Sequence, residues 1–73
     1  AIDTRLTRVG AGVIGVRSSN TTTGGALNFL EQTAPSAPSA NEVVVYAEDN
    51  GSGKTRLMAR FNTGAAQVLA TEP

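Results

Sequence analysis

The sequence contains no cysteine, no histidine and no tryptophan, and its aromatic residues are one tyrosine and two phenylalanines. Without cysteine the chain forms no disulfides, and without cysteine or histidine a zinc or haem site is disfavoured. A 73-residue chain that lacks these supports gains about as much from burial as it loses in conformational entropy. Of the usual remedies only oligomerisation is left, so we expect a multimer.

Long apolar runs and a charge imbalance are also missing. No stretch approaches the 18 or more apolar residues of a membrane span, and the start of the chain has no signal-peptide pattern. Six basic and six acidic residues cancel, and they form no basic stripe. We therefore expect no membrane partner and no direct nucleic-acid binding. Ala1 is the residue that removal of an initiator methionine would expose, so we expect a complete gene product made in a cytoplasm.

Groups that carry catalysis are scarce. The remaining candidates are carboxylates, Lys54, Tyr46 and hydroxyl side chains, and the acidic residues lie mostly beside turns or chain ends. Glu48 and Asp49 together with Asn50 lack the alternating acidic spacing and the terminal glutamate of a calcium loop. We predict no enzyme, no cofactor and no metal site.

Residues 1–31 are predicted to form a β-rich amino-terminal segment. Gly10, Gly12 and Gly15 argue against a helix, because each costs about 1 kcal/mol there relative to alanine. Two strands joined by a tight turn around the first two glycines fit better. The return strand would contain Val13, Ile14 and Val16.

Two further stretches of this segment are less regular. Residues 18–25 are predicted to form a polar loop. In residues 26–32, Leu27 and Phe29 alternate as in a strand, although Leu27 and Leu30 also suit one helical turn. We slightly favour the strand because the surrounding sequence is rich in β signals.

Residues 32–41 are predicted to form an extended connector. The stretch 33–40 repeats Ala-Pro-Ser and has no side chain worth burying, as is typical of a polyproline-like linker. At ~3.1 Å per residue it spans roughly 20 Å or more. This length suits either a strap on the surface of the same subunit or a link to another subunit.

Residues 42–73 predict a β-meander of three strands. The run Val43-Val44-Val45-Tyr46 has the highest β-propensity of the chain, and both of its faces are apolar. Strands are also predicted at 55–61, where Leu57, Ala59 and Phe61 would share a face, and at 65–71. A short chain cannot easily cover both faces of such a strand, which again indicates partner subunits.

The loop between the first two of these strands contains Gly53-Lys54-Thr55, the ending of a phosphate-binding loop. The first glycine of that motif should stand at position 48, which is a glutamate, and a period-two strand pattern replaces the expected helix. Asn50, Gly51 and Gly53 instead predict a hairpin turn, because these residue types tolerate positive φ. Lys54 and Arg56 would then face Glu48 or Asp49 across the hairpin, as a cross-strand charge pairing.

The ordered pattern of residues 32–73 resembles a module found in structural proteins of tailed bacteriophages. It has a Pro/Ala connector, an apolar strand ending Tyr-Ala, an Asn-Gly-x-Gly-Lys-Thr hairpin, Leu-Met-x-x-Phe, and Thr-Gly-Ala before a closing strand. Residues 4–19 are similar, more weakly, to the short strand repeats of phage fibre proteins. The resemblance implies interwoven homotrimers in a virion assembled in the bacterial cytoplasm. The trimer core it implies is Val43, Val45, Tyr46, Leu57, Phe61, Val68 and Leu69.

The resemblance implies a structural role. Unlike the longer members, the chain is expected to lack a receptor-binding head after residue 73, which favours a compact adaptor or decoration protein. Our first expectation is a capsid decoration (cement) protein bound to the major capsid protein. The alternative within the virion is a tail-fibre or baseplate adaptor, and a third class is a nucleotide-binding protein using the Gly53-Lys54-Thr55 motif.

Overall fold

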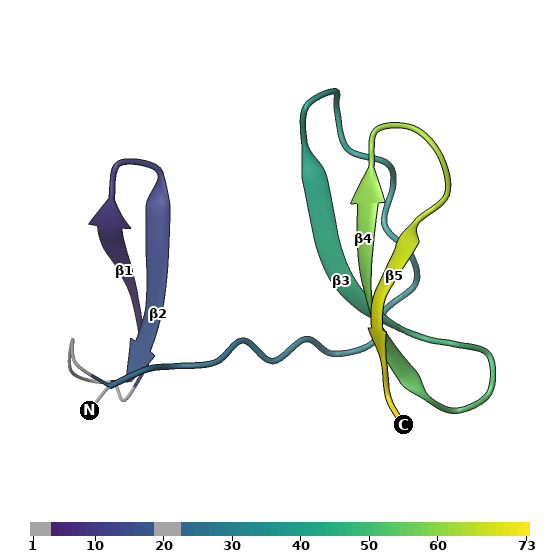
Figure 1. Cartoon of the computed structure of the whole chain (residues 1–73), viewed down its shortest axis with the longest axis horizontal. Helices are drawn as coiled ribbons and strands as arrows, with labels where there is room; N and C mark the ends of the chain where they lie inside the picture. Colours follow the sequence, from purple (N-terminus) through teal and green to yellow (C-terminus); the bar gives the residue numbers. More distant parts are fainter. Residues whose placement is uncertain (1–3, 19–22) are drawn as a thin grey trace.

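The chain folds, in its computed structural model, into two small antiparallel sheets (Figure 1). The structure describes residues 4–18 and 23–73, and only the backbone of Thr4 and Arg5. The strands are β1 (Thr4–Gly10), β2 (Val13–Ser18), β3 (Val43–Asp49), β4 (Thr55–Phe61) and β5 (Gln67–Thr71). This part of the chain contains no helix, so none that could cross a membrane. The predicted all-β class and the carboxy-terminal meander are confirmed.

The first sheet is the hairpin β1–β2. Its turn is Ala11-Gly12, where Gly12 has a φ of 73°, a left-handed conformation that favours glycine. The register pairs Leu6 with Val16 and Arg8 with Ile14, so these four side chains share one face. No described residue of the hairpin is buried.

The second sheet has the strand order β3-β4-β5 and two distinct faces. We call the first the Val43 face; the register assigns to it Val43, Val45, Ala47, Leu57, Ala59 and Phe61. We call the other the Tyr46 face; it carries Val44, Tyr46, Glu48, Arg56, Met58 and Arg60. Val68 pairs with Met58, and Leu69 lies at a β-bulge in β5. The bulky core is on the Tyr46 face, where Tyr46 is 0% exposed and Met58 is also buried.

The Pro/Ala connector is a strap on its own sheet. Its start is held by a 2.9 Å hydrogen bond from the backbone N–H of Gln32 to the carbonyl of Ala47. Its far end is held where the side-chain amide of Asn62 donates to the carbonyl of Pro38, also at 2.9 Å. Figure 1 shows the segment between these points passing behind the strands. Residues 31–34 line a hollow together with Glu48 of the Tyr46 face. Since the hairpin strands do not contact this sheet, we infer that the connector is the segment that covers this face.

The segment between the two sheets differs from its prediction. Residues 26–32 form no strand; within them, Glu31 makes an isolated parallel bridge to Ala47. Leu27, Phe29 and Leu30 are exposed, so the alternation of apolar residues here does not mark a buried face. Of the predicted loop 18–25, residues 19–22 lie outside the described part. The return of residues 23–25 along β2 includes a 3.1 Å bond from the Gly25 N–H to the Val16 carbonyl.

The two sheets remain apart. No strand of the hairpin contacts a strand of the carboxy-terminal sheet. The radius of gyration is 15.0 Å, whereas a compact chain of this length would have about 11 Å. The chain is therefore two small β units joined by residues 26–30, which cross between them in Figure 1.

Candidate functional site

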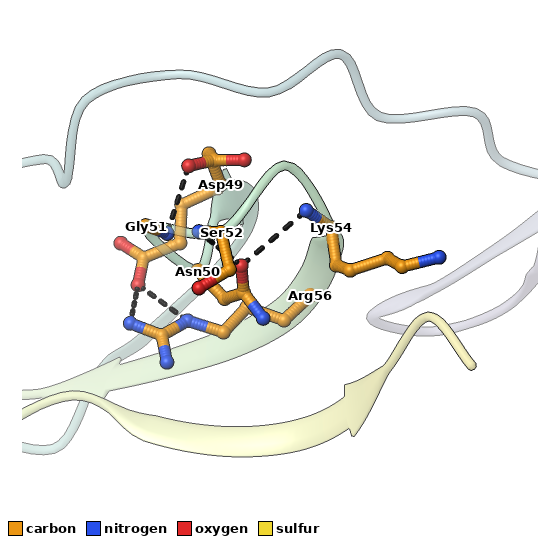
Figure 2. Close-up of polar contacts among 7 residues, drawn as sticks. Asp49, Asn50, Gly51, Ser52, Lys54 and Arg56 are labelled. Carbon is orange, nitrogen blue, oxygen red and sulfur yellow. Dashed lines mark hydrogen bonds and ion pairs between the residues drawn. The ribbon is translucent and has the colours of Figure 1, made fainter.

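The β3–β4 loop holds the three residues predicted to form the hairpin turn, and Figure 2 shows how it is built. Gly51 and Gly53 have φ values of 92° and 81°. The side-chain oxygen of Asn50 accepts hydrogen bonds from the N–H groups of Ser52 and Lys54, at 2.8 and 3.3 Å. The Asp49 carboxylate accepts from the Gly51 N–H at 2.8 Å. The loop thus satisfies its own donors, as Asx turns do.

This geometry bears on the phosphate-binding interpretation. A phosphate loop presents free backbone N–H groups and opens a helix, so that donors and helix dipole converge on the anion. Here the N–H groups of Gly51, Ser52 and Lys54 already donate to side chains of the loop, and a strand follows. The Asp49 carboxylate already accepts from the Gly51 N–H, and its negative charge would repel a phosphate there. The arrangement favours a hairpin turn over a nucleotide site.

The predicted cross-strand charge pairing is present for Arg56. Its Nε and Nη2 both donate to Oε2 of Glu48, at 2.8 and 2.5 Å, and both side chains are largely covered. The prediction was wrong for Lys54, which forms no ion pair with a described residue and whose side chain extends away from Arg56 in Figure 2. The ion pair lies on the Tyr46 face beside the loop, and Glu48 neutralises the charge of Arg56.

The Val43 face has the features of an interaction surface. Val43 is 50% exposed and Phe61 is 43% exposed although they are direct cross-strand partners, and Val45 beside them is also exposed. Ala47 and Ala59, small residues of the same face, are buried. Large exposed side chains gathered on one sheet face, rather than scattered, mark a site for association.

A hollow lies at one end of this face. Val43 and Phe61 line it together with Glu42 and Asn62. Glu42 is exposed and accepts a 3.0 Å hydrogen bond from the Ser39 N–H through one carboxylate oxygen. Among the described residues it forms no ion pair. The hollow therefore combines an apolar floor with an acidic rim.

The structure separates the seven residues that the resemblance placed in a trimer core. Val43, Val45, Leu57 and Phe61 share the Val43 face. Tyr46 lies on the opposite face and is completely buried within the single chain, so its side chain is not available to another copy. Val68 and Leu69 are exposed on β5, an edge strand of which all five residues are exposed.

A second apolar surface was not singled out by the sequence reasoning. Leu6 and Ile14, on the shared face of the β1–β2 hairpin, are 72% and 71% exposed. Together with Val13 they line a shallow groove. The sequence did contain a signal for this surface, because a hairpin of only two strands cannot bury its own apolar side chains.

Comparison of the chain with models of known families, with curated proteins and with solved structures finds no match. Within the described ranges, no group of three or more acidic, histidine or cysteine side chains is placed to hold a metal ion. The Val43 face and the hairpin face are thus the features on which a functional proposal rests.

Proposed function

We propose that the protein is a homotrimeric decoration protein of a tailed-bacteriophage head, which binds the assembled major capsid protein and stabilises the shell. The observation that carries the proposal is the Val43 face, where Val43, Val45 and Phe61 are exposed although the core on the opposite face is buried. The resemblance of residues 32–73 to phage structural modules supplies the biological setting.

The physical basis of a trimer is burial. The Tyr46 face is closed by the chain's own connector, whereas the Val43 face leaves several large side chains in water. Burial of such side chains contributes about 25 cal/mol per Å2 of apolar surface removed from water. A 73-residue chain with few bulky residues gains from sharing this surface between copies.

The mechanism of stabilisation is mass action. A trimer that binds adjacent capsid subunits in the assembled shell, and not free subunits, lowers the free energy of the shell by its binding free energy. With many trimers per particle the contributions sum, so the head withstands more internal pressure. No chemical step is needed, in keeping with the prediction that the chain is not an enzyme.

The test compares heads with and without the protein. Decorated heads are expected to release their DNA at a higher temperature than heads from phage that lack the gene, and added protein should restore the difference. Equal release temperatures would reject the role. Copy number in purified particles separates the alternatives: hundreds for a decoration protein, and a few multiples of three for a tail-fibre or baseplate adaptor.

A further inference from the structure

The β1–β2 hairpin is an element without a partner in its own chain. Leu6 and Ile14 are its most exposed large side chains, and neither hairpin strand contacts the carboxy-terminal sheet. An isolated two-stranded hairpin is at best marginally stable in water. Its shared face therefore requires a surface from outside the chain.

We propose that the hairpin of one copy docks on the Val43 face of a second copy, so that the trimer is held by exchange of amino-terminal hairpins. This inference rests on the homotrimer in the proposed function and specifies how its subunits join. The two surfaces are both apolar, and each is left uncovered by the described part of its own chain.

Charge supports a second copy as the occupant. Residues 4–18 carry three arginines and no acidic residue, whereas residues 31–73 carry more acidic than basic residues. Arg8 lies on the same hairpin face as Leu6 and Ile14, is exposed, and forms no ion pair with a described residue. Glu42 stands at the rim of the hollow beside Val43 and Phe61. Docking Ile14 into this hollow brings Arg8 to Glu42, which fixes the orientation of the contact.

The linker between the two units permits the exchange. The joining residues 26–30 extend to roughly 17 Å at about 3.3 Å per residue, and both hairpin strands already stand clear of their own sheet. Residues 26–29 form no hydrogen bond or ion pair in the described structure. Leu27, Phe29 and Leu30 are exposed, which is unusual for a linker that stays in water. A linker that crosses an interface between copies would cover them.

The geometry of the proposed contact is also compatible with a closed ring of subunits. A hairpin-to-sheet contact joins two different surfaces, so it is heterologous and each copy both gives and receives a hairpin. Such contacts close into a ring when the rotation per subunit divides a full turn. A third of a turn per subunit would close three copies into a ring, which is the case that the proposed trimer requires.

The absence of cysteine provides a clean cross-linking test. Chains with Ile14→Cys and chains with Phe61→Cys, one of them tagged, are mixed, refolded and treated with a short bis-maleimide. We expect covalent heterodimers as the main product. Val9→Cys is the matched control, because Val9 is exposed on the opposite hairpin face and should give at least tenfold less product with Phe61→Cys.

Other cross-linking products overturn the exchange. Dimers of the Ile14→Cys chain with itself would show that hairpins pack on each other. A chain that carries both Ile14→Cys and Phe61→Cys serves as a further check. An internal cross-link within single copies of that chain would show that the hairpin folds onto its own sheet. Heterodimers that form equally with the Val9→Cys control would show random collision.

A charge-reversal cycle tests the orientation independently. Arg8→Glu and Glu42→Arg should each weaken trimer formation about tenfold or more, measured by sedimentation, and the double variant should recover most of that loss. Lack of recovery would overturn the pairing of Arg8 with Glu42. If the wild-type chain sediments as a trimer but the Ile14→Cys and Phe61→Cys chains give no heterodimer, the exchange is rejected and the proposed function stands. The cross-link without any effect on head stability would reject the decoration role alone.

Discussion

The hairpin and the carboxy-terminal sheet are both antiparallel β structure, yet they differ in what holds them together. The sheet has a third strand and a connector strapped across one face, and Tyr46 is completely enclosed. The hairpin has two strands and no buried residue in its described part. The comparison shows that strand pairing alone does not make a core. One covered face is what separates a stable unit from an element that needs a partner.

The largest expected effect is the difference in stability between two truncations, one of a buried side chain in the carboxy-terminal sheet and one of an exposed side chain in the hairpin. Met58→Ala should lower the free energy of unfolding by about 2–5 kcal/mol, because it leaves a cavity on the Tyr46 face. Ile14→Ala should change it by about 0.5 kcal/mol or less at dilutions where the chain is monomeric. Denaturant titrations of both variants check this, and equal effects would abolish the distinction between the two units.

A concentration series sharpens the same comparison. If the hairpin docks on another copy, the effect of Ile14→Ala should grow as trimers form, since the side chain is then buried. The effect of Met58→Ala should persist at every concentration, because Met58 is buried within one chain.

The next effect concerns the attachment of residues 23–25 to β2. A Cβ at Gly25 would stand 2.9 Å from backbone atoms of Val16, whereas one at Gly24 would meet nothing within 4 Å. Gly25→Ala should therefore displace the segment at a cost of about 1–3 kcal/mol. Amide hydrogen exchange at Ser18, which donates to the Thr23 carbonyl, should accelerate. Gly24→Ala is the matched control, and the same acceleration in both variants would contradict the prediction.

A smaller effect is expected in the β3–β4 loop. Asn50→Ala removes the acceptor of the Ser52 and Lys54 N–H groups and should cost about 1 kcal/mol. Ser52→Ala, in the same loop, should stay within about 0.5 kcal/mol. Thermal unfolding of the two variants measures the difference. If Asn50→Ala did not lower the unfolding temperature, the glycines alone would hold the turn.

The smallest effect concerns Tyr46. Its hydroxyl is buried and has no hydrogen-bond partner among the described residues. Tyr46→Phe should therefore leave stability unchanged or raise it by up to about 1 kcal/mol, because an unsatisfied polar group is removed. A denaturant titration measures the change, and destabilisation by Tyr46→Phe would show that the hydroxyl is hydrogen-bonded within the folded chain.

Much of the candidate site could be predicted from local patterns. The alternation in residues 55–61 gave the strand with its true bounds, and the loop composition gave the hairpin between β3 and β4. The pairing of Arg56 with Glu48 followed from that register. By contrast, the seven apolar residues assigned to one core lie on two faces and at a bulge, because β-propensity does not say which face is covered.

The sequence by itself determined the β class, the turns and the lack of disulfides, since these depend on residue type and on spacing along a short stretch. Only the tertiary structure decided that the Pro/Ala connector folds back over the Tyr46 face and leaves the Val43 face in water. It also decided that residues 26–30 cross to the sheet without joining a strand. The physical reason is that a strand with two apolar faces has no preference for which face is covered. Contacts between residues distant in the chain decide which face is buried.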